Sequence, residues 1–339
     1  MKYRYIGKSG LRVTPICMGT MSFGSWSTKE ESFKILDAAY DRGINFFDTA
    51  ELYPIPPRSD YAGLTEEILG EWLQTKPRES IILASKVAGA ANGWFAPPIR
   101  FGLTAIDRFH IQRAVEGSLK RLKTDYIDLY QVHWPDTLIP KEESMRALDE
   151  LIKSGKVRYL GTSNDTTYGL CKSNTIAQYE TLARFESIQN NFSLLNPRFL
   201  DELSTLCRNE TISLLPYSPI GGGVLSGKYN QSFIDPYSRF GEYFHSKESR
   251  QKAMYDRFVN TKTLDATAKY LELARKFDIH PVTLAVAWSM HFDFVASTII
   301  GARYASQLEV SFKAFELTLP KELLNECEKI QKEILYPMG

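Results

Sequence analysis

The sequence has no arrangement of cysteines that is typical of a disulfide framework or a metal site. Its four cysteines, Cys17, Cys171, Cys207 and Cys327, are scattered, and none belongs to a CxxC pair. Such spacing is typical of free thiols in a reducing compartment, so we expect a cytoplasmic protein. The opening residues, MKYRYIGKSG, also lack the apolar segment that a secretory signal contains.

Long apolar runs and an excess of one charge are missing as well. No run approaches the roughly 18 apolar residues that a membrane-spanning helix needs. The 41 Lys and Arg residues nearly balance the 40 Asp and Glu residues, for a net charge of +1. We therefore expect neither nucleic acid nor a membrane as a partner. With five histidines, and only His133 at an expected strand end, a metal-dependent barrel hydrolase is disfavoured and no metal site is predicted.

What the 339 residues do contain is a regular alternation of short β-prone segments and amphipathic helical segments. Alternation of this kind is typical of an α/β protein with a parallel sheet. Gly19 and Gly24 after the first strand do not have GxGxxG spacing, which disfavours a doubly wound dinucleotide-binding sheet. We therefore predict a (β/α)8 TIM barrel, formed by a single domain over residues 1–339. The first expected strand ends before Gly19. The seven later strands are expected at residues 44–47, 81–84, 126–132, 157–160, 185–189, 212–216 and 296–300.

Several additions to the plain barrel are expected. Residues 3–6 and 11–13 predict an N-terminal hairpin, and residues 323–334 predict an extra helix packed outside. Long loops on the active-site side are expected at 88–107 and 217–260. The expected helices cover residues 28–43, 64–73, 111–122, 142–154, 175–182, 198–209, 264–277, 282–291 and 307–315.

Local signals mark some of these elements. Thr28 and Glu31 have the spacing of a capping box, and Thr65 is a candidate cap for the next helix. In the loop 88–107, the aromatic residues Trp94, Phe95 and Phe101 are expected either to pack the loop down or to form a wall of a substrate pocket. The pattern does not choose between these two roles.

Four ionisable side chains follow three of the expected strands: Asp48, Tyr53, Lys86 and His133. The carboxyl ends of barrel strands form the active site, so we expect the four to converge there. A phenol has a pKa near ~10 and is a reluctant acid at neutral pH. An adjacent Lys86 ammonium, kept charged by Asp48, would lower the pKa of Tyr53. His133 would orient a substrate carbonyl, whose oxygen Tyr53 would protonate as the carbon receives a hydride.

Each of these residues also has an ordinary interpretation. An aspartate at a strand end is most often a cap or turn former. A single tyrosine or lysine usually packs at the surface, and a histidine in an apolar strand is usually a core residue. Their joint placement at three strand ends favours the catalytic interpretation.

Six separated motifs, in order along the chain, carry a resemblance to a known family. They are GINFFDTAELY (43–53), ASK (84–86), LYQVHWPD (129–136), GTSN (161–164), PYSPIGGGVLSGKY (216–229) and IIGAR (299–303), which is followed by Gln307. The sequence resembles the aldo-keto reductase family over nearly its whole length. Within that family it is similar to the long-chain, Tas-like bacterial branch. The resemblance implies that Asp48, Tyr53, Lys86 and His133 form a catalytic tetrad in a barrel that binds NADPH/NADP+.

The resemblance also implies which residues contact the cofactor. Ser163, Asn164 and Gln189 would hydrogen-bond the nicotinamide carboxamide, Tyr217 would stack on its ring, and 19–21 would lie along the ribose. Segment 218–228 would cover the pyrophosphate with help from Arg239, and the last helix would receive the adenosine end. The full implied set is Gly19, Thr20, Met21, Asp48, Ser163, Asn164, Gln189, Tyr217, Ser218, Pro219, Ile220, Gly221, Leu225, Gly227, Lys228, Arg239, Gly301, Ala302, Arg303, Gln307 and Ser311.

Arg303 favours NADPH over NADH, because arginine is suited to a phosphate and a helix start attracts one. Alternatively, Arg303 is a plain surface residue and the Gly221 run is a flexible loop. Two positions depart from the family pattern: Val310 and Ser311 stand where the family commonly has Glu-Asn. The sequence therefore does not determine how the adenine ring is bound.

The leading hypothesis is an NADPH-dependent reductase that converts an aldehyde or ketone to an alcohol, with Tyr53 as the general acid. The alternative is a nicotinamide-binding regulatory or sensor subunit with negligible turnover. The small-molecule carbonyl substrate, the stereochemistry and the oligomeric state are not determined by the sequence.

Overall fold

A closed barrel of parallel strands forms the centre of the protein. The computed structural model describes residues 2–90 and 97–338. Within them, eight parallel strands form one sheet in the order β10-β3-β4-β5-β6-β7-β8-β9. These strands are β3 (Ile16–Gly19), β4 (Phe46–Asp48), β5 (Ile82–Val87), β6 (Ile127–Val132), β7 (Val157–Ser163), β8 (Phe185–Gln189), β9 (Ser213–Leu214) and β10 (Thr298–Ile300).

Hydrogen bonds close this sheet on itself. The Leu214 N–H donates to the carbonyl of Phe294 at 2.8 Å, and the Ala296 N–H donates to the carbonyl of Leu214 at 3.1 Å. The segment before β10 therefore pairs with β9, while β10 pairs with β3. The predicted (β/α)8 barrel is confirmed.

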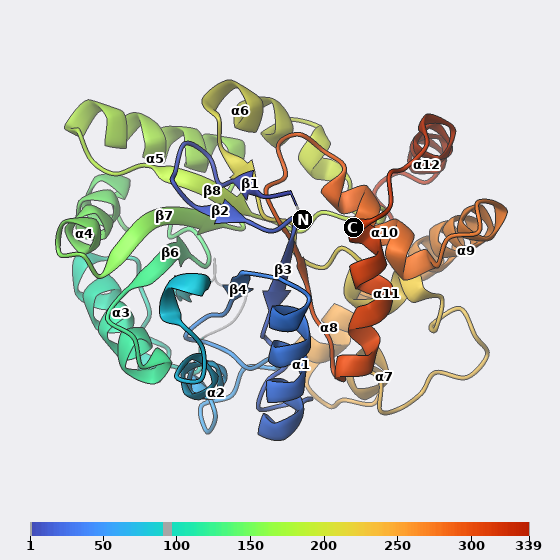
Figure 1. Ribbon diagram of the computed structural model, residues 1–339, viewed down its shortest axis with the longest axis horizontal. Helices are drawn as coiled ribbons and strands as arrows, with labels where there is room; N and C mark the ends of the chain where they lie inside the picture. Colours follow the sequence, from blue (N-terminus) through green and yellow to red (C-terminus); the bar gives the residue numbers. More distant parts are fainter. Residues whose placement is uncertain (1, 91–96, 339) are drawn as a thin grey trace.

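Helices surround the sheet on the outside (Figure 1). The helices around the strands are α1 (Lys29–Asp41), α2 (Leu64–Leu73), α3 (Arg108–Leu122), α4 (Lys141–Lys153), α5 (Thr167–Glu180), α6 (Leu203–Glu210), α9 (Thr261–Lys276), α10 (Pro281–Met290) and α11 (Leu308–Phe312). The extra helix α12 (Lys321–Glu333) packs against α9 outside this ring, as predicted. No helix in the described part of the chain is long and apolar enough to cross a membrane.

The cap predictions were partly wrong. The Thr28 side chain accepts from the Glu31 N–H and starts α1, but the Glu31 carboxylate accepts from Ala305 N at 2.9 Å instead of closing the box. Thr65 is not a cap, because α2 begins after Gly63 and the Thr65 hydroxyl donates to the carbonyl of Phe23. In both cases a partner distant in sequence takes the side chain that local spacing had assigned to the helix.

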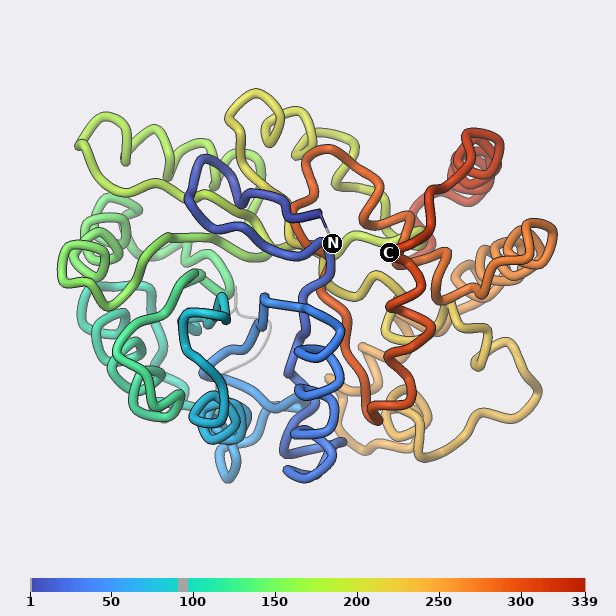
Figure 2. Tube along the Cα trace, viewed as in Figure 1, coloured from blue at the N-terminus to red at the C-terminus, as the bar shows by residue number. Residues whose placement is uncertain are grey.

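The long connection after β9 is more ordered than its sequence indicates. Residues 217–260 contain a 3-10 segment, η5 (Gly221–Ser226), and two helices, α7 (Arg239–Phe244) and α8 (Ser249–Phe258). In Figure 2 this connection runs along the lower right of the molecule. In the other long loop, η3 spans Arg100–Gly102, whereas Trp94 and Phe95 lie outside the described residues.

The N-terminal hairpin seals one end of the barrel. β1 (Arg4–Tyr5) and β2 (Arg12–Val13) pair antiparallel, as predicted, and cross in front of the strands in Figure 1. Ile6 and Leu11 share a buried cluster with Phe46 inside the barrel. A second, larger apolar cluster fills the layer between the strands and the helices. The site is therefore left to the opposite end, where the strands finish.

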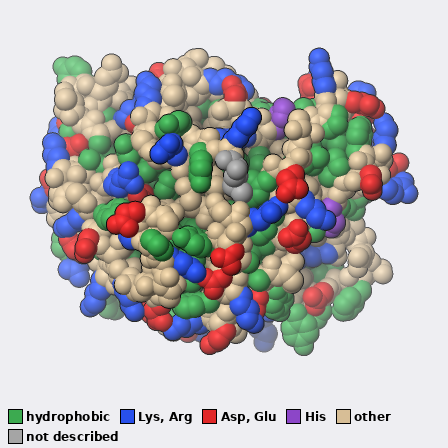
Figure 3. All heavy atoms as spheres, in the orientation of Figure 1, with side chains coloured by type: hydrophobic (Ala, Val, Ile, Leu, Met, Phe, Trp, Pro, Cys, Tyr) green, Lys and Arg blue, Asp and Glu red, His purple; other side chains and the backbone are tan. Residues whose placement is uncertain are grey.

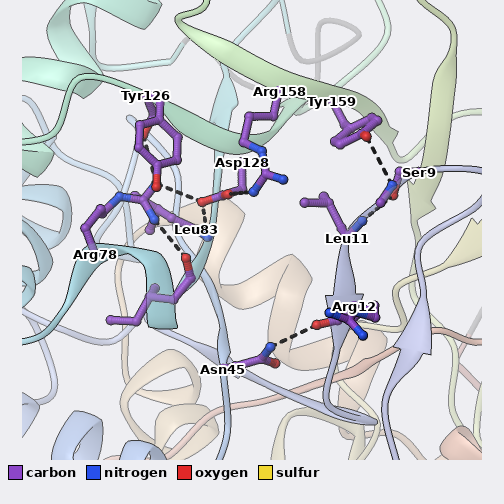
Figure 4. A network of polar contacts seen from close by, with 12 residues as sticks. Ser9, Leu11, Arg12, Asn45, Arg78, Leu83, Tyr126, Asp128, Arg158 and Tyr159 are labelled. Atoms are coloured by element: carbon purple, nitrogen blue, oxygen red, sulfur yellow. Dashed lines mark hydrogen bonds and ion pairs between the residues drawn. The ribbon is translucent and has the colours of Figure 1, made fainter.

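An ion-pair network around the buried Asp128 ties the strand starts together at the hairpin end (Figure 4). The Asp128 carboxylate accepts from Arg78 at 2.7 Å, from Arg158 at 2.5 Å and from the Leu83 N–H at 3.0 Å. Arg78 also lies over the Tyr126 ring, 4.0 Å from its centroid. These contacts join β5, β6 and β7, so they contribute to stability at the end remote from the chemistry.

The surface seen from the hairpin end carries both signs of charge, with acidic and basic side chains interspersed (Figure 3). A cavity of about 470 Å³ opens beside the ion-pair network, lined by Tyr126, Asp128 and Arg158 among others. Because it lies at the strand starts, it is separate from the four converging side chains described next.

Candidate active site

The centre of the site is a buried ion pair between neighbouring strands. Lys86 Nζ lies 2.5 Å from Asp48 Oδ2 and donates to the carbonyl of Thr49 at 2.8 Å. Lys86 is fully buried and Asp48 is 2% exposed. Burial favours the neutral amine, but the charge of Asp48, aided by Tyr53, outweighs it and raises the pKa of Lys86. Lys86 is therefore an ammonium at neutral pH, as the sequence predicted.

Tyr53 lies on the turn after β4, against this ammonium. Lys86 Nζ is 5.0 Å from the centroid of the Tyr53 ring. Burial raises the pKa of Tyr53, and this effect outweighs the opposing charge of Lys86. The expectation of a lowered pKa was therefore wrong in its net direction, because the sequence does not show how deeply the phenol is buried. At neutral pH the phenol carries its proton.

His133 forms the third side of the same space. Its ring packs edge-on to Tyr53, with centroids 5.7 Å apart, and stacks on Trp134 at 3.8 Å. Burial, together with the charge of Lys86, lowers the pKa of His133 well below 6.5, so the imidazole is neutral. The His133 Nδ1 atom is buried and has no hydrogen-bond partner among the residues described. The structure thus brings all four predicted side chains together.

The residues expected near a nicotinamide ring form one connected group beside these four. The Tyr217 hydroxyl donates to Asn164 Oδ1 at 2.7 Å, and Asn164 Nδ2 donates to the carbonyl of His133 at 2.9 Å. The Ser163 hydroxyl donates to the backbone carbonyl of Gln189 at 2.8 Å. The group therefore lies at the strand ends, and the Asn164 amide is oriented by Tyr217, the carbonyl of His133 and the Ser163 hydroxyl.

The β3 end lies directly against Asp48. Thr20 donates to the carbonyl of Asp48 through both its N–H and its hydroxyl, at 3.1 and 3.0 Å. At Gly19 a Cβ would come within 2.7 Å of Ile299 Cγ2, so the tight packing of β3 on β10 requires glycine. Met21 follows on the loop, and its carbonyl accepts from the Ile55 N–H.

The glycine run after β9 lies beside two cations. Gly222 and Gly223 have φ of 63° and 103°, a left-handed region that favours glycine. A Cβ at Gly223 would lie 3.2 Å from Lys228 Nζ, and one at Gly222 would lie 3.5 Å from an Arg239 nitrogen. Lysine and arginine side chains placed together in this way suit an anionic ligand. The neighbouring candidates are Ser218, Ile220, Gly221 and Gly227 on the same turn, with Pro219 buried.

The Leu225 side chain does not face the proposed site for an anionic ligand. Its side chain is 2% exposed and belongs to the main apolar core. The sequence pattern placed it in the loop, but the turn of η5 directs it inward. Any contact it makes with a ligand is therefore restricted to its backbone.

The start of the last barrel helix is fastened to the β3 loop. The Ser22 hydroxyl donates to the carbonyl of Ala302 and the Ser27 hydroxyl to that of Arg303, each at 3.0 Å. The Arg303 N–H donates to Gln307 Oε1 at 2.9 Å. Ser311 lies buried one turn further on, and Gly301 is exposed.

The Arg303 guanidinium faces the connection after β9. It contacts the carbonyl of Tyr237 and lies 3.7 Å from Glu242, which accepts from the Trp26 indole at 2.7 Å. Arg239 lies over the same indole, 5.4 Å from its centroid. The Nε atoms of Arg239 and Arg303 are both buried without a hydrogen-bond partner among the described residues. Two arginines with unused donors are thus held near each other.

Comparison with known proteins decides the family. The profile of the Aldo/keto reductase family matches residues 15–332, nearly the whole chain. The chain belongs to the aldo/keto reductase family. It is 35% identical over 357 residues to protein tas of Escherichia coli K12, covering 99% of both chains.

Other relatives carry names of oxidoreductases. The chain is 33% identical to the uncharacterized oxidoreductase YrpG of Bacillus subtilis, covering 97% of this chain and 96% of the relative. It is 28% identical to norsolorinic acid reductase A of Aspergillus parasiticus, covering 98% of this chain and 81% of the relative. Membership and relatives together support an oxidoreductase that acts in carbonyl reduction.

Sequence analysis missed one member of the site in this aldo/keto reductase. Gln131 is fully buried and donates to Asp48 Oδ1 at 3.0 Å, beside Gln189, which donates to the same oxygen at 2.8 Å. Gln131 lies opposite Lys86 in the strand register. A signal was present, because Gln131 stands two residues before His133 and so shares its face of the strand.

Replacing His133 with glutamine is expected to reduce the loss in the free energy of unfolding at acidic pH. The folded protein keeps this histidine neutral, whereas the unfolded chain takes up a proton below about pH 6.5. Above that pH, the titration of His133 therefore does not change the free energy of unfolding. Below it, His133 lowers the free energy of unfolding by up to about 1.4 kcal/mol per pH unit. Urea unfolding at about pH 7.5 and 5 measures this loss. It should shrink in His133→Gln but not in His245→Gln, which alters an exposed histidine; equal losses in all three proteins would contradict the assignment.

Proposed function

We propose that this protein reduces an aldehyde or ketone to the alcohol with NADPH, and that Tyr53 is the general acid. The observation that carries the proposal is the buried contact of Tyr53 with the Lys86–Asp48 ion pair, with neutral His133 alongside. A proton donor, a fixed positive charge and a hydrogen-bonding ring around one space suit protonation of an oxygen that becomes negatively charged.

The proton step follows from the charges of these side chains. Tyr53 holds its proton until a more basic oxygen lies beside it, and Lys86 stabilises the phenolate that remains. Asp48 keeps Lys86 charged, while Gln131 and Gln189 hold the second oxygen of Asp48. His133, being neutral, orients the substrate carbonyl without competing for the proton. When bound, NADPH supplies the hydride.

The residues present fit such a cofactor. Beside the glycine turn 221–223, Lys228 Nζ lies close to Gly223 and an Arg239 nitrogen lies close to Gly222, and two such cations suit a pyrophosphate. At the other end, Arg303 has a buried Nε without a partner among the described residues. This supports our proposal that Arg303 receives the 2′-phosphate and that NADPH is preferred over NADH.

Replacing Arg303 with methionine is expected to weaken NADPH binding about 10- to 100-fold, because a hydrogen bond to a charged group contributes about 1.5–3 kcal/mol. Binding of NADH, which has no 2′-phosphate, should change little. Quenching of tryptophan fluorescence gives both dissociation constants. Arg146→Met is the control, since Arg146 pairs with Glu180 on the surface of α4. Equal weakening of NADPH and NADH would contradict the phosphate assignment.

A screen of NADPH oxidation tests the function itself. Aromatic aldehydes, dicarbonyls and sugars are to be offered, with product alcohols identified to exclude uncoupled oxidation. A sensor subunit would bind NADPH and turn over none of them. The sensor alternative is not favoured, because the acid and its supporting charges are all in place and a pure sensor has no need of them.

We further propose that residues 1–339 act as one catalytic domain and that the protein works in the cytoplasm. The second point is supported by the cysteines, which are free in the structure. Neither point affects the chemistry proposed above.

A further inference from the structure

Glu51, two residues before Tyr53, connects the turn of the acid to the strand of the ammonium. Its side chain is 4% exposed, and its Oε1 accepts from the Ala88 N–H at 2.7 Å. Ala88 stands two residues after Lys86, and the Glu51 N–H donates to the carbonyl of Lys86 at 3.4 Å. Side chain and backbone of Glu51 therefore both hold the Tyr53 turn against the end of β5.

Arg100 reaches the same carboxylate from the segment before α3. Its two terminal nitrogens donate to Glu51 Oε2 at 2.7 Å and to Oε1 at 2.9 Å, and the second also donates to the carbonyl of Ala88 at 3.0 Å. The pair is thus bidentate and mostly out of water, a geometry in which Arg–carboxylate bonds are strong and directional. Lysine cannot reproduce it.

The segment held by Arg100 has an unusual backbone. Arg100 and Phe101 have φ of 49° and 56°, a conformation that non-glycine residues adopt rarely and that surrounding contacts must maintain. Phe101 and Leu103, which follow Arg100, are exposed apolar side chains. The position of these two side chains therefore depends on the ion pair with Glu51.

We propose that Glu51 and Arg100 are positioning residues that seat segment 97–107 beside the site and select carbonyl substrates by width. The terminal nitrogens of Arg100 are engaged by Glu51 and Ala88. Its charge is neutralised within the protein, so the seated segment offers apolar side chains to an uncharged substrate. The substrate part of this proposal rests on the proposed reductase function, whereas the seating of the segment does not.

Steady-state kinetics with a wide and a narrow aldehyde, 2-naphthaldehyde and propanal, test the substrate part. Arg100→Met and Glu51→Gln should raise KM for 2-naphthaldehyde about tenfold, the loss expected for about 1.4 kcal/mol of substrate positioning. The KM for propanal, the dissociation constant of NADPH and, in Arg100→Met, kcat should stay within about twofold. Arg108→Met, which removes an exposed arginine paired with Glu150 at the start of α3, should behave as the unmodified protein. Unchanged KM for both aldehydes in Arg100→Met would overturn the selection of substrates by width.

Chymotryptic cleavage after Phe101 tests the seating without any turnover. Arg100→Met and Glu51→Gln should be cut about tenfold faster than the unmodified protein and Arg108→Met under conditions in which all four remain folded, because local opening governs cleavage. The double variant should be cut no faster than either single variant if the two residues act as one pair. Equal cleavage rates in all proteins would overturn the proposal. If instead cleavage accelerates while the unmodified protein reduces no carbonyl, the reductase function and the substrate part fail and the seating stands.

Discussion

Replacing Tyr53 with phenylalanine is expected to lower kcat about 10²- to 10⁴-fold, the contribution typical of a general acid. The change removes one hydroxyl and leaves the ring against Lys86, so the cavity keeps its shape. With no donor beside it, the oxygen that gains charge must take its proton from water. The dissociation constant of NADPH should stay unchanged, because the lost hydroxyl is not among the groups proposed to hold the cofactor.

The control for this prediction is Tyr159→Phe. Tyr159 lies on β7, and its hydroxyl accepts from the Gly10 N–H at the hairpin end, remote from the site. It therefore loses a hydroxyl of the same kind without touching the chemistry, and kcat should stay near that of the unmodified enzyme. Turnover by Tyr53→Phe at a near-normal rate would remove the proton donor from the proposal, whatever the cofactor.

Replacing Lys86 with methionine is expected to affect both stability and activity. Lys86 is fully buried and Asp48 nearly so, and removing one partner leaves an uncompensated buried carboxylate. Breaking a buried pair in this way typically costs about 3–5 kcal/mol in the free energy of unfolding. Activity should be lost at the same time, since the phenolate of Tyr53 would have no positive charge beside it. Urea unfolding at neutral pH and an NADPH oxidation assay measure the two effects.

The contribution of Lys86 to the free energy of unfolding should depend on pH in one direction. The pKa of Lys86 is raised in the folded protein, so its contribution is complete below the unfolded pKa of about 10.4. It is lost as the pH rises through the folded value. Lys332→Met is the control, because Lys332 and Glu328 form a pair at a similar distance that is exposed on both sides, and it should change little. A Lys86→Met protein as stable as this control would contradict the buried ion pair.

The amino-acid sequence by itself determined the architecture and the identity of the four central side chains. Alternating apolar segments predict strands, and the carboxyl ends of parallel strands meet at one end of a barrel. Asp48, Lys86 and His133 were therefore expected together before any coordinates, because their convergence follows from chain order and strand direction alone. Gln131 was within reach of the same reasoning, through its two-residue spacing from His133.

Only the tertiary structure decided the features that depend on how deeply a side chain is buried and on contacts between residues far apart in the sequence. The pKa of Tyr53 rises because burial outweighs Lys86, and burial is not visible in a sequence. Glu31 and Thr65 look like helix caps locally, but they bind Ala305 and Phe23 once the barrel closes. Arg100 meets Glu51 across 49 residues for the same reason. Local patterns report periodicity and strand ends, whereas these contacts arise when closure of the sheet brings separate loops to one end.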